Sequence, residues 1–594
     1  MCGIIACRTH SPAVDYLLVA LGRLEYRGYD SVGIATRTTA GDVVRMRTVK
    51  RIGAIDSVVR SWTGADFDGV GIGHTRWATH GPATEGNAHP HVDCTGRISI
   101  VHNGIIENAD ELRRGLLNAG HGIVTEVDSE VIAHLIEDRM TTSDDLVGAV
   151  RSTLAVLRGS WALAVLDERT GRIVVAAHRS PLLIAHTGHG DFATSDIAAV
   201  SDWVNEFRAL DEGEVVELTG RNGWMNHVTG EAISRLIPCA WTAGDVGLNG
   251  RADYMAKEID EQPAAVARVV DEFAGGVADG SLWRGLGLAP FERVEVIGCG
   301  TSLNAGRVIG NALRRVGGLP VRVTVASEAD AEVDEPNTMR LALSQSGETA
   351  DVLNAIAQPR LATSLLALTN NPHSTLARSA DAVVTCLAGP EIGVAATKTF
   401  VCQVVSGVAV MVSALVDTGR LSSSAALAVV DDLRRLPDRL ASAATVAKCA
   451  VPPIIDELVD ASGFIFIARG SGLPYAAEGA LKLKELSYRW AEHYPAGELK
   501  HGPLALVDDG TPVVVVDNGD PRLAMNVAEV RTRGGRVVSV GTPGGTVAVE
   551  CDPAAAWGPI ESILPLQILA RDLALSLGRD VDRPRNLAKS VTVE

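Results

Sequence analysis

A repeated pattern in the second half of the chain constrains its fold most strongly. An apolar run beginning at Val294 (VEVIG) leads into the small-residue turn CGTS and a helical stretch, and a similar run beginning at Phe464 (FIFIA) leads into RGSG and another helical stretch. A second pair of runs, LALSQSGETADVL near Leu341 and VVVVDNGDPRLAM near Val513, keeps nearly the same offset. Strands that alternate with helices through Gly-rich turns are typical of doubly wound α/β folds with parallel sheets. We therefore predict two such domains.

The first part of the chain has a different texture. Short apolar runs such as GVGIGHT, RISIVHNG and WALAVL are punctuated by Gly, Asn, Asp and Thr, with helical stretches near VDYLLVALGRLEY and VDSEVIAHLIEDRM. This mixture predicts an α+β layered domain. The expected organisation is an α+β domain at 1–235, a linker and connecting helix at 236–284, α/β domains at 285–425 and 455–578, and a C-terminal tail at 579–594.

Composition excludes several classes of protein. The 594 residues are 46% hydrophobic and 21% charged, as in soluble globular chains, and a formal net charge of −18 argues against nucleic acid or anionic membrane as the main partner. Nine scattered cysteines without a CxxC pair favour neither a zinc ribbon nor a disulfide framework. The N-terminus lacks the features of a signal peptide, so we expect a cytoplasmic protein.

One uncharged segment is long enough to suggest a membrane span. It runs from Thr399 to Val416 and contains Gln403 and two serines, and nothing like it recurs in the chain. We expect a helix buried at the centre of an α/β domain.

A hydroxyl-rich turn follows the apolar run near Leu341. Ser344, Gln345, Ser346 and Thr349 surround a glycine there, and Ser302 lies at the end of another strand of the same predicted sheet. Hydroxyls beside the free amides of a helix start form an anion site, although they can also serve only as helix caps. No GxxxxGK[ST] motif is present, so a sugar phosphate is a better candidate than ATP. In the matching turn of the second repeat, acids replace the hydroxyls and should repel phosphate.

A charged helix face lies further on. In EGALKLKE, Glu478, Lys482 and Glu485 recur at helical spacing on one face, whereas Lys484 points elsewhere. The spacing alone is equally consistent with surface ion pairs and with a catalytic group.

Residues between Arg76 and Asn108 suggest a pocket for an amino acid. Arg76 can pair with a carboxylate through a bidentate fork, and Asp128 can hold an ammonium group. His89, His91 and Cys94 could instead be metal ligands, but no fourth ligand lies at a sensible spacing, and we expect no metal. Asn103 and Gly104 offer the donors of an oxyanion hole, although an Asn-Gly pair between apolar runs also predicts a tight hairpin turn.

These motifs carry a resemblance to known proteins. GCGTS followed by SQSGET resembles the sugar-isomerase (SIS) domain. With EIGVAATK, EGALKLKE, AGELKHGPLAL and PRNLAKSVTVE, the chain resembles the glutamine–fructose-6-phosphate aminotransferase (isomerising) family from end to end. The opening MCGIIAC resembles that of class II glutamine amidotransferases, which implies an N-terminal-nucleophile glutaminase domain with αββα layers, followed by two SIS domains.

For the glutaminase half, the resemblance implies a nucleophile at Cys2. Removal of Met1 would leave Cys2 with a free α-amine, whose reference pKa of about 8 lets it accept the thiol proton. Asn103 and Gly104 would stabilise the oxyanion. The glutamine-binding residues would be Arg76, Trp77, Thr79, His80 and Asp128, with Trp77 also gating ammonia.

For the sugar half, the resemblance implies that Glu485 moves a proton between C1 and C2 of the sugar, with Lys482 assisting. His501 would act in ring opening from the neighbouring subunit, which implies a homodimer, and Lys589 would form a Schiff base with the ketose. The reaction would make D-glucosamine 6-phosphate and L-glutamate from D-fructose 6-phosphate and L-glutamine without a cofactor, as the first step toward UDP-N-acetylglucosamine. The sugar-phosphate ligands would be Thr301, Ser302, Ser344, Gln345, Ser346, Thr349, Val394 and Ala588.

Two segments depart from the family pattern. The usual opening MCGIVG is MCGIIAC here, and a basic-aromatic FRYR stretch is replaced by the acidic residues 329–336. Surface drift explains this more simply than a specialised paralogue acting on a related ketose phosphate. A related deglycase or isomerase, an amidotransferase with another acceptor, and a non-catalytic SIS sugar-phosphate sensor are the remaining alternatives.

Overall fold

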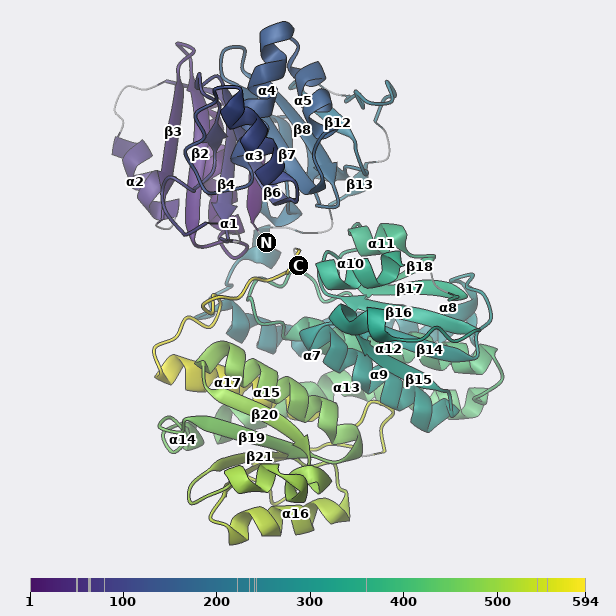
Figure 1. The fold of residues 1–594 in the computed structure, drawn as a ribbon. Helices are drawn as coiled ribbons and strands as arrows, with labels where there is room; N and C mark the ends of the chain where they lie inside the picture. The colour runs from purple at the N-terminus through teal and green to yellow at the C-terminus, as the bar shows by residue number, and fades with distance from the viewer. Residues whose placement is uncertain are drawn as a thin grey trace. The chain divides into compact units, whose positions relative to one another are not determined.

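The structure is a computed structural model that describes residues 2–49, 52–61, 66–78, 81–221, 223–233, 236–239, 241, 243–358, 361–541, 543–552 and 554–592. Contacts divide the chain into two units (Figure 1). The first unit groups residues 1–247 with residues 588–594, and the second comprises residues 248–587. Both predicted α/β domains lie in the second unit, and their exact bounds stay predictions.

Two antiparallel sheets face each other in the first unit. On the first strand, Ile4 and Ala6 point into a core shared with the second sheet, while Ile5 and Cys7 pack under a helix that includes Leu17. Because both faces of this strand are buried, its sequence is a continuous apolar run rather than an alternating one. Among the described residues the first sheet has the order β13 (Ile237–Pro238), β11 (Glu206–Ala209), β9 (Leu183–Thr187), β10 (Gly190–Thr194), β1 (Gly3–Thr9), β4 (Phe67–Arg76), β2 (Ser31–Thr38) and β3 (Val43–Thr48), and the second has the order β12 (Val215–Leu218), β8 (Arg172–His178), β7 (Gly159–Asp167), β6 (Ile98–Ile106) and β5 (His91–Val92).

Helices cover the outer faces of both sheets. The first helix buries Leu17 and Leu21 against the first sheet, and the helices after residue 129 bury Ile132, Ile136 and Val150 against the second. The layering is therefore αββα, which confirms the predicted fold class of this part. The helices of this unit are α1 (Ala13–Leu24), α2 (Ile52–Ser61), α3 (Ala109–Asn118), α4 (Glu130–Thr142), α5 (Leu146–Leu154) and α6 (Ala243–Val246).

Two parallel sheets of identical strand order form the second unit, as the repeat predicted. In each sheet the second strand of the sequence lies on one side of the first and the third strand on the other, so the strand order reverses beside the first strand. Open α/β sheets bind ligands at this point, beyond the carboxyl ends of the strands. The sheets are β15 (Val321–Val325), β14 (Arg293–Gly298), β16 (Thr338–Ser344), β17 (Ser364–Thr369) and β18 (Ala382–Thr385), and β20 (Trp490–Pro495), β19 (Gly463–Ala468), β21 (Pro512–Val516), β22 (Arg536–Gly541) and β23 (Val547–Ala548).

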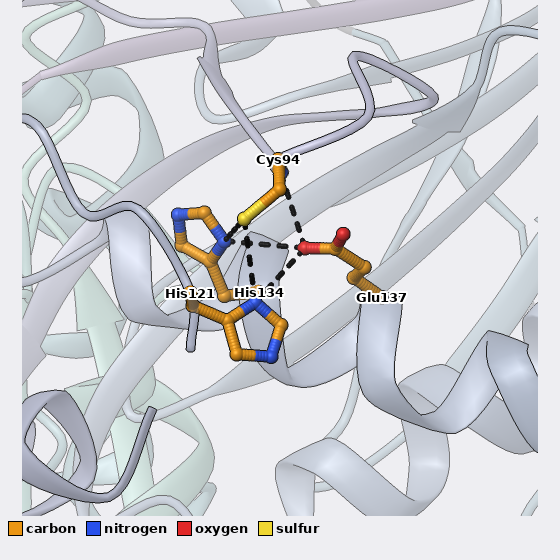
Figure 2. A group of neighbouring side chains, drawn as sticks. All are labelled: Cys94, His121, His134 and Glu137. Carbon is orange, nitrogen blue, oxygen red and sulfur yellow. Dashed lines mark hydrogen bonds and ion pairs between the residues drawn. The ribbon is translucent and has the colours of Figure 1, made fainter. Parts of the chain in front are cut away.

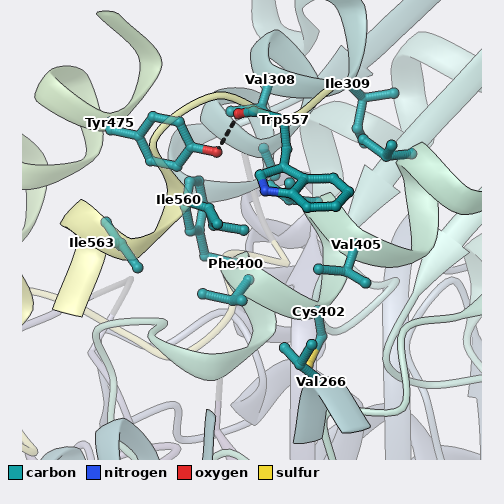
Figure 3. Close-up of a cluster of buried hydrophobic side chains, with 14 of the residues drawn as sticks. Val266, Val308, Ile309, Phe400, Cys402, Val405, Tyr475, Trp557, Ile560 and Ile563 are labelled. Atoms are coloured by element: carbon teal, nitrogen blue, oxygen red, sulfur yellow. Dashed lines mark hydrogen bonds between the residues drawn. The ribbon is translucent and has the colours of Figure 1, made fainter. Parts of the chain in front are cut away.

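One apolar core joins the helices between these two sheets. Figure 3 shows Phe400, Tyr475 and Trp557 within it, and the Tyr475 hydroxyl donates to the Trp557 carbonyl at 2.7 Å. Few aromatic side chains are needed because Val, Leu, Ile and Ala fill most of the volume. The helices of this unit are α7 (Tyr254–Phe273), α8 (Ser281–Arg284), α9 (Gly300–Gly317), α10 (Ala350–Ala357), α11 (Thr375–Ser379), α12 (Lys398–Asp417), α13 (Ser423–Ala450), α14 (Pro452–Ile455), α15 (Leu473–Ser487), α16 (Pro521–Thr532) and α17 (Ile563–Ser576).

The membrane-like segment is helix α12. It is the one helix among the described residues that is long and apolar enough to cross a membrane, and 94% of its most apolar window is buried inside the protein. Its neighbours are α7, α8 and α9. The prediction of a core helix is confirmed.

We predict that Gly407→Ala destabilises the second unit. A Cβ at Gly407 on α12 would lie 2.3 Å from Ile309 Cδ1, so the expected overpacking cost is about 1–3 kcal/mol. Gly275→Ala is the control, because a Cβ there meets nothing within 4 Å. Differential scanning calorimetry should show a lower transition temperature for Gly407→Ala alone, and equal transitions would contradict the packing described here.

Candidate active sites

Cys2 lies at the start of β1 beside the end of β4. The Trp77 N–H donates to Cys2 Sγ at 3.3 Å, and the Arg27 guanidinium donates to the Cys2 carbonyl at 3.4 Å. Burial raises the pKa of the Cys2 thiol, while the Trp77 N–H and the Arg76 guanidinium act in the opposite direction. The thiol therefore needs a nearby base to become a nucleophile.

Asn103 points its amide at this cysteine. Its Nδ2 donates to the Cys2 carbonyl at 3.0 Å, and its Oδ1 lies 3.0 Å from His74 Nε2. Burial lowers the pKa of His74 to about 3, so the ring is neutral, and its Nε2 contacts only acceptor oxygens and must carry the proton. His74 thus holds the Asn103 amide with its NH₂ group toward the nucleophile. A histidine within the apolar run GVGIGHT is the signal that sequence analysis missed.

Asn103 and Gly104 do not form a hairpin turn. Both lie inside β6, paired with Ala162 and Trp161 of β7, so the turn interpretation is wrong. Gly104 has a φ of +129°, and a Cβ there would lie 2.1 Å from the Ser160 carbonyl oxygen. Glycine at position 104 is therefore required by the backbone conformation of the strand rather than by a turn.

Arg76 and Asp128 are both buried near Cys2, with 3% and 7% of their surfaces exposed. Arg76 donates to the carbonyls of Gly81 and Pro82, and Asp128 accepts from the Ile106 N–H at 2.8 Å. The Arg76 guanidinium can bind the carboxylate of a free amino acid, and the Asp128 carboxylate can bind its ammonium group.

A single pocket brings most of the predicted glutaminase residues together. Thr79 and His80 lie outside the described residues. The pocket also includes Thr592 from the end of the chain, which no sequence pattern indicated. The lining residues are Cys2, Arg76, Trp77, His89, His102, Asn103, Gly104, Val127, Asp128, Ser129 and Thr592.

In the second unit, the hydroxyl-rich turn connects β16 to α10. Ser344 Oγ contacts Thr349 Oγ1 at 2.9 Å and accepts from the Gly347 N–H at 3.0 Å, and Ser346 Oγ accepts from the Glu348 N–H. Gly347 has a φ of +69°, and a Cβ there would collide with Ser374. The turn therefore gathers the hydroxyls of Ser344, Ser346 and Thr349 at the strand end.

Ser302 lies at the neighbouring strand end. It follows β14, on the other side of the point where the strand order reverses, and its hydroxyl accepts from the buried Gln403 amide at 3.1 Å. Gln403 is the polar residue that interrupts the membrane-like segment, and it serves here to orient Ser302.

The equivalent turn in the second sheet contains no such cradle. The Asn518 amide donates to the Arg469 carbonyl at 2.9 Å, and the Asp520 carboxylate caps α16 and contacts Arg522. These polar groups are engaged in contacts within the protein.

Glu478, Lys482 and Glu485 form a chain of charges on α15. Lys482 Nζ lies 3.5 Å from Glu478 and 2.7 Å from Glu485, and the side chains of Glu478 and Lys482 are 0% and 1% exposed. The surface ion-pair interpretation is therefore wrong for Glu478 and Lys482. Burial raises the pKa of Glu478, and the two carboxylates outweigh the effect of burial on Lys482 and raise its pKa.

Glu478 also contacts the domain built on the first parallel sheet. Thr301 Oγ1 donates to one of its oxygens at 2.8 Å, and Asn304 Nδ2 donates to the other at 2.9 Å. Both donors lie on α9, close to Ser302 in the sequence. Helix α9 therefore both contacts the charged residues of α15 and carries Ser302.

The remaining predicted sugar-site residues are more scattered. Val394 is buried, and its N–H donates to the Asp582 carbonyl at 3.1 Å. His501 is exposed at the end of the short helix η5 (Ala496–His501). Ala588 and Lys589 belong to the first unit, so their roles in the sugar site stay predictions.

The histidines near Cys94 do not form the metal site considered above. The His89 ring lies against those of His74 and His91, with ring centroids 4.1 and 4.3 Å apart, and the ring nitrogens of His89 and His91 have no hydrogen-bond partner among the described residues. Cys94 instead contacts His121 and His134.

Comparisons with known proteins agree with this architecture. The SIS domain model matches residues 287–413 and 457–576, and the glutamine amidotransferase domain model matches residues 74–202. A glutamine amidotransferase is therefore joined to two sugar-phosphate-type domains in one chain. Glutamine–fructose-6-phosphate aminotransferases (isomerising) of Thermus thermophilus and Pseudomonas putida are 41% and 39% identical, over all of both chains. The chain belongs to this family.

A solved structure supports the same assignment for the second unit. The C-terminal domain of glucosamine-fructose-6-phosphate aminotransferase from Francisella tularensis is 32% identical, with a TM-score of 0.52, and the match covers 57% of this chain and 99% of that domain.

The buried histidines predict a pH dependence of stability. Burial lowers the pKa of His91 to about 3, so below pH 6.5 the unfolded chain takes up a proton that the folded chain refuses. The stability of the first unit should therefore fall as the pH drops from about 6.5 toward 3. His91→Phe should reduce the fall in transition temperature between about pH 7 and pH 5, whereas His10→Gln, at an exposed site, should not. An unchanged slope in His91→Phe would contradict the prediction.

Proposed function

We propose that this chain transfers the amide nitrogen of L-glutamine to D-fructose 6-phosphate and isomerises the product to D-glucosamine 6-phosphate, with release of L-glutamate. The names of the full-length relatives support this activity. The observation that carries it is the presence, in one chain, of a buried cysteine pocket with paired charges and a hydroxyl-rich strand end beside a buried Glu–Lys–Glu chain.

The first half-reaction is hydrolysis of the glutamine amide. Once Met1 is removed, the α-amine of Cys2 takes the thiol proton and Sγ attacks the amide carbon. Arg76 would bind the α-carboxylate of glutamine, and Asp128 its ammonium group. The Asn103 amide and the Gly104 N–H would stabilise the oxyanion, with His74 holding the amide in place. Ammonia leaves, and water then releases glutamate from the thioester.

The second half-reaction takes place on the sugar. The Lys589 amine condenses with the C2 carbonyl of the open-chain ketose and releases water, and ammonia then displaces the lysine. Glu485 moves a proton from C1 to C2 while the proton of the C1 hydroxyl is lost and the imine nitrogen gains one, which converts the ketose imine into the amino aldose. Lys482, ion-paired with Glu485 at 2.7 Å, holds that carboxylate in position. Hydroxyls of Ser302, Ser344 and Thr349, among others, would bind the phosphate.

We further propose a homodimer in which His501 serves the sugar site of its partner. The His501 side chain is exposed on the single chain, at the end of η5 and next to the unusual backbone of Gly502, with a φ of +145°. A catalytic histidine with that exposure would be enclosed by a second copy. A cytoplasmic location also stays a prediction.

A specialised paralogue with a different ketose phosphate is the second candidate. It rests on the acidic residues 329–336, but the charges there are engaged within the domain. Glu332 pairs with Arg322, and Glu335 pairs with Arg293 at 2.8 Å. The arrangement favours a surface change without consequence for the substrate, and an assay of several ketose phosphates separates the two possibilities.

Substitutions at the two reactive residues should separate the half-reactions. Cys2→Ala should lower glutamine hydrolysis and glutamine-dependent amination by at least about 10³-fold, because the nucleophile is gone. Lys589→Ala should lose amination and keep glutaminase activity. Glutamate release and glucosamine 6-phosphate are measured by mass spectrometry, with Cys7→Ala and Lys484→Ala as controls. Amination that survives in Lys589→Ala, or glutaminase activity that survives in Cys2→Ala, would contradict the proposal.

Mixed dimers test the shared sugar site. If His501 acts in the partner, a mixture of His501→Ala and Glu485→Ala chains contains one intact site in every mixed dimer. Random exchange makes half of the dimers mixed, so about a quarter of the parental activity should return after co-refolding or co-expression. Each variant alone should be inactive. A mixture as inactive as its components, although mass spectrometry detects mixed dimers, would show that His501 acts within its own chain.

A further inference from the structure

Four side chains with metal-binding atoms meet in the first unit, and none of them lines the Cys2 pocket. Figure 2 shows Cys94, His121, His134 and Glu137, whose ligand atoms all lie within 4.8 Å of one another. Cys94 comes from the turn between β5 and β6, His121 from the loop after α3, and the other two from α4, three residues apart on one face. Among the described residues this is the only group of three or more His, Cys, Asp or Glu side chains whose ligand atoms converge in this way.

Four of the six distances between these atoms match those of a four-coordinate site, and the other two are within 4.8 Å. Cys94 Sγ lies 3.4 Å from the Nδ1 atoms of both His121 and His134. Glu137 Oε2 lies 3.1 Å from His121 Nδ1 and 3.3 Å from His134 Nδ1. Four-coordinate zinc, with bonds of about 2.0–2.3 Å, separates its ligand atoms by about 3.3–3.6 Å. The four side chains therefore converge on a volume that one ion would fill.

The surroundings of the two imidazoles follow the pattern of metal sites. His121 Nε2 lies 2.9 Å from Asp138 Oδ1, and His134 Nε2 lies 3.7 Å from Glu130 Oε1. A histidine that binds a metal through one ring nitrogen nearly always has a carboxylate, carbonyl or water at the other. Here both rings offer Nδ1 to the centre. The Nε2 of His121 is at hydrogen-bond distance from a carboxylate, and the Nε2 of His134 is at ion-pair distance from one.

The sulfur is supported and accessible. The Gly122 N–H points at Cys94 Sγ from 3.4 Å, as it would toward a thiolate. Cys94 is exposed and His134 is buried, so an ion can reach the site from solvent and still be held against the core.

We propose that Cys94, His121, His134 and Glu137 bind one structural zinc ion. A sulfur, two imidazole nitrogens and a carboxylate oxygen form the donor set of this borderline-soft cation, whereas calcium and magnesium prefer oxygen ligands throughout. The site revises the expectation of no metal, and it carries no step of the reaction. The sequence concealed it because the ligands are separated by 26, 12 and 2 residues, without a compact motif.

The ion would stabilise the segment that carries Asp128. Glu130, which faces His134, also accepts from the N–H groups of Val124 and Thr125 at 2.9 and 2.8 Å. The loop from 121 to 130 is thus held at His121 by the ion and at Glu130 through His134. Cross-linking this loop to the β5–β6 turn ties together three elements on one side of the second sheet.

The test measures zinc in the full-length protein. The protein is stripped with a chelator, dialysed with zinc and washed, and its metal content is determined by inductively coupled plasma mass spectrometry. About one ion per chain is expected for the parent and for Cys449→Ser, a matched exposed cysteine in the second unit. Cys94→Ser and His121→Ala should retain little zinc. No zinc uptake by the folded parent, or equal uptake by the variants, would overturn the proposal and leave a hydrogen-bonded cluster.

Two further measurements do not depend on how well those variants fold. Cobalt bound to the Cys2→Ala protein should give the intense visible spectrum of a tetrahedral site with a thiolate ligand, and an octahedral spectrum would contradict the assignment. Asp138→Asn, which alters only the support of His121, should weaken zinc affinity by about 10–100-fold in competition with a chromogenic chelator. Unchanged affinity in this variant would contradict the proposed role of Nδ1 of His121 as a ligand.

Discussion

The buried carboxylate of Glu478 is the interaction on which the sugar half of the molecule depends. It has no exposed surface and lies between the Lys482 ammonium and the donors Thr301 and Asn304. A charge in such a place is tolerated only when every partner is present, and removal of one partner is costly. The carboxylate therefore forces α15 of one sheet and α9 of the other into a fixed relation. Glu485 lies on α15 and Ser302 lies on α9, so the predicted proton-transfer group and the predicted phosphate ligand take their relative positions from the contacts of Glu478.

A comparable restraint organises the glutaminase pocket. His74 is held neutral by burial and can donate only to oxygens, which leaves the Asn103 amide one orientation. Gly104 follows with a backbone conformation that a side chain would prevent. Both restraints decide where the predicted oxyanion donors point. In both halves the predicted reacting groups are thus positioned by buried polar contacts with neighbouring elements, as preorganised sites require.

Much of the fold could be predicted because its strands are buried on both faces. Such strands appear as continuous apolar runs, and those at Val294, Leu341, Phe464 and Val513 revealed the two parallel sheets. Local sequence was a poorer guide to secondary structure where tertiary contacts determine the backbone conformation. Asn103 and Gly104 suggested a turn, but pairing with β7 keeps them in a strand.

The sites were predicted best where their residues are adjacent in sequence. The turn from Ser344 to Thr349 is local, so its hydroxyls could be recognised before the fold was known. Thr592 and Cys2 are neighbours only after folding, and the same is true of Cys94 and His121. The spacing of Glu478, Lys482 and Glu485 on α15 could be recognised in the sequence. The burial of Glu478 and Lys482 could not, because it follows from packing against α9.

The central claim is that the amide nitrogen of glutamine becomes the amino group of the sugar phosphate. The most direct measurement supplies amide-¹⁵N-labelled glutamine and fructose 6-phosphate in buffer without added ammonium, and determines the isotope in the product by mass spectrometry. The account predicts glucosamine 6-phosphate that carries almost exclusively ¹⁵N. Product that contains unlabelled nitrogen, or no aminated sugar at all, would contradict it.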